Sequence, residues 1–282
     1  MQSAKINEPS NLISDAVQRI IREGSLAALV TIVEAPGIES VGLKLLVDTS
    51  GEIVGTLDGV GESDHMGALD EAVAREAGKF LQSREETCVF QVKEFASELT
   101  SSLEAKLLFE RIEPEPRLVI CGAGHVGAAL ARIASLLGYR TTLIDDRREF
   151  LARDRFPDER IETVEATVWR EAVTLAVGNG KKVSVAIVTR GHSEDEQCLR
   201  AVIDLNPDYI GLIGSKRRTN IVLERLRNDG ATEEALNAVR APVGLDIGAV
   251  TPEEVALAIM AEVVSVRRGG KGASLSEWRR SR

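Results

Sequence analysis

A glycine-rich segment near the middle of the chain has the residue types that hold phosphate groups. Residues 121–127 read Cys-Gly-Ala-Gly-His-Val-Gly and contain the pattern G-x-G-x-x-G, with glycines at Gly122, Gly124 and Gly127. The first glycine allows a tight turn, the second lets backbone amides approach a pyrophosphate, and the third lets a helix pack against its strand. Because the pattern follows an apolar strand and opens a helix, it predicts dinucleotide binding. The alternative is a Rossmann fold that holds no nucleotide.

Acidic and basic residues follow the next expected strand. Asp145 ends that strand 18 residues after Gly127, where an acid accepts a hydrogen bond from a ribose hydroxyl. Asp145 and Asp146 together disfavour a 2′-phosphate, which ranks NAD-like or pterin-dinucleotide-like ligands above NADP. Arg147 and Arg148 soften this inference, since an arginine can hold a phosphate.

Other loops add candidate contacts to the same ligand. Within the glycine turn, His125 and Val126 are candidates, and His125 is either a ligand contact or a solvated loop histidine. Arg190 could bind an anion, and His192, two residues later, could move a proton near neutral pH. Ser215, expected to cap a helix, is followed by the cations Lys216, Arg217 and Arg218 and makes a second possible anion site. The alternative for both segments is an ordinary polar loop. The candidates in these later loops are Arg190, Gly191, His192, Gly214, Ser215, Lys216, Arg217 and Asp246. Asp246 is either a ligand contact or a residue that stabilises its turn.

Two domains are needed to position these residues. We expect a small α+β domain over residues 1–112, an extended Glu-Pro-Glu-Pro linker over 113–116, a Rossmann-type domain over 117–268 and a flexible tail over 269–282. The fold class is therefore α/β, a C-terminal Rossmann-type parallel sheet preceded by a small α+β domain.

Apolar periodicity places the elements of both domains. In the first domain we expect helices over 11–23 and 65–81 and strands over 26–33, 41–47, 53–57, 89–92 and 107–112. In the second we expect strands over 118–121, 141–144, 161–164, 183–189 and 209–213 and helices over 126–137, 169–177, 194–205 and 217–228. A last helix begins at Thr251, with Pro252 in its first turn and Glu254 completing a capping box.

Composition excludes several classes of protein. The formal net charge is −9, which disfavours nucleic-acid binding. The polar first ten residues lack a signal-peptide core, and the longest apolar run, 26–33, is too short to span a bilayer, so we expect no membrane association. Three separated cysteines and three separated histidines indicate a cytoplasmic location, no disulfide and no metal site. They are Cys88, Cys121, Cys198, His65, His125 and His192. No spacing indicates a catalytic nucleophile and base.

Four separated motifs, in order, carry a family resemblance. They are residues 117–146 with the GAGHVG turn, 189–192 (TRGH), 209–218 (YIGLIGSKRR) and 242–264 (PVGLDIGAVTPEEVALAIMAEVV). Together they resemble the xanthine dehydrogenase accessory protein (XdhC/CoxI) family. Residues 41–47 and 51–56 extend the likeness into the first domain, so it covers most of the chain.

The resemblance implies a maturation factor rather than a catalyst. Family members are similar to chaperones that bind the molybdenum cofactor, as molybdopterin or its dinucleotide form, assist its sulfuration and deliver it to a molybdenum hydroxylase. The implied partners are that client enzyme, a cysteine desulfurase-type sulfur donor and a second copy of the chain. Two segments depart from the family pattern: residues 58–62 lack a cysteine found in many relatives, and residues 193–195 lack a second histidine.

Two other functions fit the residues themselves. The glycine turn and Asp145 are compatible with an NAD-dependent oxidoreductase, in which Arg190 and His192 would be the available catalytic residues. A ligand-sensing or scaffold protein that kept the fold and lost the chemistry is the third possibility.

Overall fold

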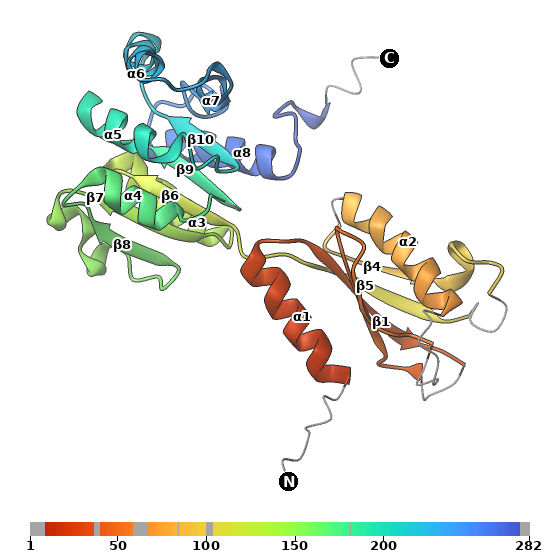
Figure 1. The fold of residues 1–282 in the computed structure, drawn as a ribbon. Coiled ribbons are helices and arrows are strands. Elements are labelled where there is room, and N and C mark those ends of the chain that lie inside the picture. Colours follow the sequence, from red (N-terminus) through yellow and green to blue (C-terminus); the bar gives the residue numbers. More distant parts are fainter. Residues whose placement is uncertain are drawn as a thin grey trace. The chain divides into compact units, whose positions relative to one another are not determined.

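The computed structural model describes residues 9–36, 40–58, 67–83, 85–99, 104–180 and 182–276. The chain divides between Pro114 and Glu115 into two compact units (Figure 1). The sequence-based limits of the linker and of the tail stay predictions. Among the described residues, no helix combines the length and apolar character needed to cross a membrane.

The first unit is an antiparallel sheet with a helix on each face. The sheet order is β3-β2-β1-β5-β4. Residues Ala28 and Val30 of β1 pack with α2, whereas Ala27 packs with α1, because successive strand residues face opposite sides. The elements are α1 (Pro9–Glu23), β1 (Ala27–Glu34), β2 (Lys44–Asp48), β3 (Ile53–Gly55), α2 (Ala68–Gln82), β4 (Thr87–Gln91), the 3₁₀ turn η2 (Val92–Glu94) and β5 (Lys106–Ile112). Residues 65 and 66 of the expected second helix lie outside the described part.

The second unit contains a six-stranded parallel sheet in the order β11-β10-β9-β6-β7-β8. This is the order of a dinucleotide-binding fold, with the direction of winding reversing between β6 and β9. The strands are β6 (Arg117–Cys121), β7 (Arg140–Asp145), β8 (Ile161–Glu165), β9 (Val183–Ile187), β10 (Tyr209–Leu212) and β11 (Val239–Arg240). The helices are α3 (His125–Leu136), α4 (Trp169–Val177), α5 (His192–Val202), α6 (Lys216–Asn228), α7 (Glu233–Ala238) and α8 (Pro252–Arg267), with 3₁₀ turns η3 (Arg148–Leu151) and η4 (Arg153–Arg155).

Helices cover both faces of this sheet (Figure 1). Val119 and Cys121 of β6 belong to the core shared with α4, α5 and α6. Leu118 and Ile120 belong to the core shared with α3 and α8. The strands are therefore apolar on both sides, as a parallel sheet requires, and the predicted fold class is confirmed.

Some elements differ from the sequence-based expectations. Helix α5 begins at His192 rather than residue 194, so His192 lies in the first turn of a helix and not in the preceding loop. Strand β9 ends at Ile187, which leaves residues 188–191 as a loop. Helix α7 and strand β11 were not expected, since six and two residues are too short to show a periodic pattern. The capping box at Thr251 and Glu254 is present as predicted.

Candidate cofactor-binding site

Two glycines of the turn are required by the fold itself. Gly122 has a φ of +113°, and a Cβ there would lie 2.6 Å from the Val188 carbonyl oxygen. A Cβ on Gly127 would lie 1.8 Å from the Gly122 carbonyl oxygen. Any side chain at either position would force backbone to move, so these glycines bring β6, α3 and the loop after β9 together.

Gly124 is different, because no atom lies within 4 Å of a Cβ built on it. It is the N-cap of α3, with a φ of −65°, and no side chain caps the helix. The first turn of α3 also has no acidic residue. His125 is exposed and Val126 is half-buried. An uncapped helix N-terminus beside open space favours an anion through its amides and its dipole.

Asp145 fastens the end of β7 to this turn. Its Oδ2 accepts a hydrogen bond from the Ala123 amide at 2.7 Å, and its oxygens also accept from the backbone N–H, Nε and Nη2 of Arg147 at 3.0, 2.8 and 3.0 Å. Burial alone would raise the pKa of Asp145, but these hydrogen bonds outweigh it and hold the pKa below its ordinary value.

The four hydrogen bonds fill the acceptor sites of the Asp145 carboxylate. A ribose hydroxyl, the partner expected from the sequence, could reach Asp145 only by displacing one of these donors. Arg147 is held further by the ring of Phe150, whose centroid lies 3.8 Å from the guanidinium carbon. In this structure Asp145 therefore positions the turn and Arg147.

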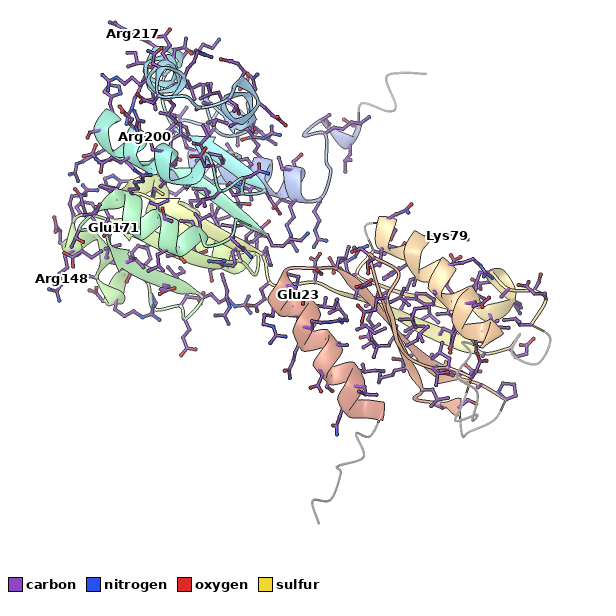
Figure 2. The ribbon with its side chains drawn as sticks, viewed as in Figure 1. Glu23, Lys79, Arg148, Glu171, Arg200 and Arg217 are labelled. Atoms are coloured by element: carbon purple, nitrogen blue, oxygen red, sulfur yellow. The ribbon has the colours of Figure 1, made fainter. Side chains whose placement is uncertain are left out.

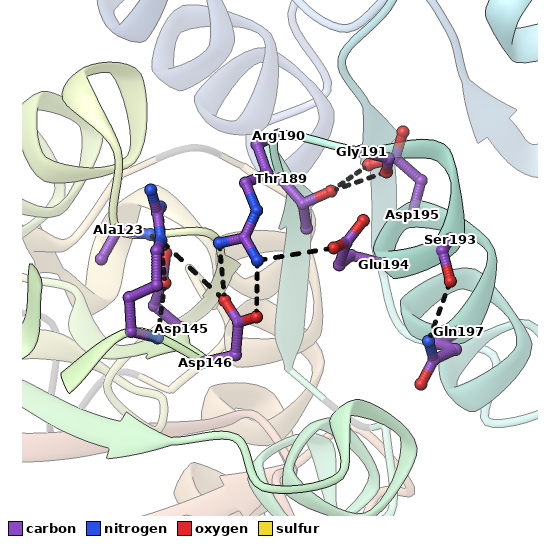
Figure 3. Close-up of polar contacts among 11 residues, drawn as sticks. Ala123, Asp145, Asp146, Thr189, Arg190, Gly191, Ser193, Glu194, Asp195 and Gln197 are labelled. Carbon is purple, nitrogen blue, oxygen red and sulfur yellow. Dashed lines mark hydrogen bonds and ion pairs between the residues drawn. The ribbon is translucent and has the colours of Figure 1, made fainter.

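An ion pair joins the loops that follow β7 and β9, the two strands on either side of β6 (Figure 3). Arg190, after β9, donates from Nη1 and Nη2 to the two oxygens of Asp146, after β7, at 2.9 and 2.8 Å. Glu194 lies 3.7 Å from the same guanidinium. Gly191 is the N-cap of α5, and His192 is exposed in its first turn.

Asp195 is a buried residue that the sequence did not single out as a site residue. Its carboxylate accepts a hydrogen bond from Thr189 Oγ1 at 2.5 Å and forms a close ion pair with Arg218 of α6. Burial raises the pKa of Asp195, although Thr189 and Arg218 act in the opposite direction. No local pattern could have revealed this pair, because Arg218 lies 23 residues further along the chain.

The loop after β10 is tied to the site through that pair. Ser215 caps α6 by accepting from the Arg218 amide at 3.3 Å, as its sequence position predicted. Gly214 precedes it with a φ of +156°. Lys216 and Arg217 are exposed, and Arg217 points outward from α6 (Figure 2).

The carboxyl edge of the sheet thus gathers most of the predicted residues. Contacts link the loops after β6, β7, β9 and β10 in one chain of interactions. Asp246 is exposed in the loop before α8, and no described contact ties it to these four loops. A hollow of about 680 Å³, lined by Arg148, Arg153 and Glu165 among others, lies at the neighbouring end of β8.

The cysteines do not contribute reactive thiols to this edge. Cys121 and Cys198 are buried, and burial raises the pKa of the Cys198 thiol well above its ordinary value. Cys88 is half-buried in β4, and burial raises its pKa too. No group of three or more metal-ligating side chains occurs among the described residues.

Comparison with known proteins decides the family. The model of the XdhC Rossmann domain matches residues 118–263, more than half of the 282-residue chain. The chain belongs to the XdhC family. The match runs from β6 into α8 and so includes each of the four loops at the carboxyl edge.

Relatives agree with this assignment. The XdhC-family chain is 32% identical over 237 residues to the uncharacterised protein YqeB of Escherichia coli, a match covering 81% of this chain and 41% of that protein. It is 29% identical over 164 residues to a probable xanthine dehydrogenase component of Bacillus subtilis, covering 57% and 46%, and 26% identical over 154 residues to the molybdenum cofactor insertion chaperone PaoD of Escherichia coli, covering 55% and 41%. The chain spans less than half the length of these curated relatives.

The crystal structure of a xanthine dehydrogenase from Bacillus halodurans has a similar fold. It aligns with a TM-score of 0.50 at 19% identity, covering 94% of this XdhC-family chain and 98% of that one. At this identity the comparison supports the architecture alone.

Proposed function

We propose that this chain binds the molybdenum cofactor and hands it to a xanthine dehydrogenase-type molybdenum hydroxylase. The observation that carries the proposal is the open, uncapped N-terminus of α3 at Gly124, between two glycines that the fold requires. Family membership and the likeness to a protein named as a molybdenum cofactor insertion chaperone support it.

The residues present fit a phosphate-bearing pterin. Amides of the α3 N-terminus would hold the phosphate or pyrophosphate of molybdopterin or its dinucleotide form. Gly124 leaves room for that group, and Arg147 and Arg190 are the nearby cations, each now held by an acid. When bound, the cofactor supplies the molybdenum centre that the client enzyme uses, while this chain binds, orients and shields it.

Sulfuration is a finer part of the proposal. We propose that a cysteine desulfurase-type donor acts on the bound cofactor, since all three cysteines of this chain are half-buried or buried and two have raised pKa values, which makes a thiol a poor nucleophile. The chain's part would then be to present the cofactor rather than to carry sulfur. A homodimer in the cytoplasm remains part of the same proposal.

The test is to purify the full chain from a host that makes molybdopterin and to identify bound pterin by mass spectrometry and by fluorescence after oxidation. Wild-type protein should carry pterin. Gly124→Ala should reduce the bound amount about tenfold or more, because a methyl group enters the space next to the phosphate-binding amides. Gly78→Ala, at an equally open glycine in α2 of the first unit, is the matched control and should retain it. Wild-type protein with no pterin and no effect on activation of the client enzyme would overturn the proposal.

An NAD-dependent oxidoreductase is the second candidate. The strand order and the G-x-G-x-x-G turn favour it, whereas the full set of donors on Asp145 opposes a ribose contact there. Calorimetry with NAD and NADH distinguishes the two: micromolar binding with redox turnover would favour the oxidoreductase. Binding of neither pterin nor NAD would leave a scaffold that kept only the fold.

A further inference from the structure

The ion pair between Arg190 and Asp146 joins the two loops that flank the glycine turn. On one side of the turn, a Cβ on Gly122 would lie 3.0 Å from the Cα of Thr189, the residue before Arg190. On the other side, the turn donates a hydrogen bond to Asp145, the residue before Asp146. Arg190 and Asp146, the next residues on the two sides, pair with each other (Figure 3). The pair therefore lies between the two loops that flank the turn, beside the place where the turn would hold a ligand.

The pair is well aligned but exposed. Both terminal nitrogens of Arg190 donate to separate oxygens of Asp146, at 2.9 and 2.8 Å, while the side chains are 47% and 29% exposed. Because water screens exposed ion pairs, even a two-point pair contributes only modestly to stability. Arg190 can thus exchange Asp146 for another two-oxygen acceptor.

A phosphate is such an acceptor. The planar guanidinium offers two parallel N–H groups, which match two phosphate oxygens as well as they match a carboxylate. A phosphate on the glycine turn would also repel the carboxylate of Asp146, because like charges at short range oppose each other. Both effects transfer Arg190 from Asp146 to the ligand.

We propose that Asp146 is an internal competitor that holds Arg190 beside the glycine turn and releases it to the phosphate of the incoming ligand. A ligand takes Arg190 from Asp146 only where its hydrogen bonds to the guanidinium outweigh this pair, and it then binds more weakly than it would without the competition. Glu194, at 3.7 Å from Arg190, lies beside the pair and lacks its two-point geometry. This inference rests on the proposed phosphate binding at the glycine turn.

The experiment measures pyrophosphate binding to the full chain by calorimetry at low, constant ionic strength. Asp146→Asn should bind pyrophosphate about two- to fivefold more tightly, since the competing pair is worth that much. It should gain no more for sulfate, because an anion that draws less on Arg190 benefits less from its release. Arg190→Gln should bind pyrophosphate more weakly than wild type, by up to about tenfold. The double variant, Asp146→Asn with Arg190→Gln, should match Arg190→Gln within about twofold.

A matched control uses a second two-point arginine–carboxylate pair, Arg227 with Glu233 at the end of α6. Glu233→Gln should leave pyrophosphate binding unchanged. A direct readout is the ¹⁵N–¹H signal of the Arg190 Nε group, identified from its absence in Arg190→Gln. It should shift on adding pyrophosphate to wild type and should already be shifted in Asp146→Asn.

Each outcome decides the inference. It is overturned if Asp146→Asn binds pyrophosphate no more tightly than wild type, if the double variant keeps the gain, or if none of the proteins binds pyrophosphate. Bound pterin in wild type with an unaltered Asp146→Asn affinity would overturn the inference alone. The expected pyrophosphate pattern without any bound pterin would overturn the proposed function while the role of Asp146 holds for another phosphate ligand.

Discussion

The Asp145 carboxylate and the Ala123 amide are joined by a 2.7 Å hydrogen bond that fixes the end of β7 to the glycine turn. Hydrogen bonds from Arg147 and this amide hold the pKa of Asp145 below its ordinary value despite burial. The stabilisation is therefore present above the unfolded-state pKa of about 3.9 and is lost as the pH falls through the lower native value.

Asp145→Asn should lower the free energy of unfolding of the second unit by about 2 kcal/mol at neutral pH, because an amide cannot replace the charged acceptor. The difference from wild type should shrink as the pH falls toward 3. Urea titrations followed by tryptophan fluorescence measure this, since both tryptophans belong to the second unit. A difference that does not change with pH would contradict the assigned role of the charge.

Gly124 and Gly127 should differ in how much stability the protein loses when each receives the same added methyl group. Gly127→Ala places a Cβ 1.8 Å from a backbone oxygen and should destabilise the second unit by about 3 kcal/mol. Gly124→Ala meets no atom within 4 Å and should cost no more than about 1 kcal/mol, the cost of replacing an N-cap glycine by alanine. Thermal and urea unfolding of both variants checks the contrast; equal losses would show that the turn is not shaped as described.

Asp195 and Arg218 should be coupled in their contributions to the free energy of unfolding. Asp195→Ala leaves the Arg218 guanidinium without its buried partner and should lower the free energy of unfolding by about 3 kcal/mol. The double variant Asp195→Ala with Arg218→Ala should lose less than the sum of the single variants. A double-mutant cycle in urea measures the coupling, and additive losses would argue against it. Glu233→Ala, which removes an exposed pair, should cause no measurable loss.

Tyr209 should connect β10 to α8 through its hydroxyl, which donates to Glu262 Oε2 at 2.7 Å. Burial raises the pKa of Tyr209 well above its ordinary value, so the hydroxyl remains a neutral donor. Tyr209→Phe should lower the free energy of unfolding by about 1.5 kcal/mol. The Gly244 amide donates to the same Glu262 oxygen at 2.9 Å. The backbone amides of the loop before α8 should therefore also exchange faster with deuterium. Unchanged exchange there would show that the loop does not depend on this contact.

Local signals in the sequence predicted what depends on neighbours along the chain. The capping box at Thr251 and the Ser215 cap follow from residues three positions apart, and both are present. The parallel sheet follows from apolar strands alternating with helices. In contrast, the Ala123 amide that donates to Asp145 comes from the loop after another strand, and the partner of Asp195 comes from another helix. Such pairings depend on how strands are ordered in space, which no spacing in one sequence reveals.

Helix α8 packs beside α3, with Ala256, Ile259 and Met260 completing the core around Ala128 and Leu130. More than a hundred residues separate the two helices in the chain. On a ribosome adding about 5–20 residues per second, α3 would wait on the order of 10 s for this support. The proposed phosphate-binding turn would thus gain its full packing only after almost the whole domain has been translated.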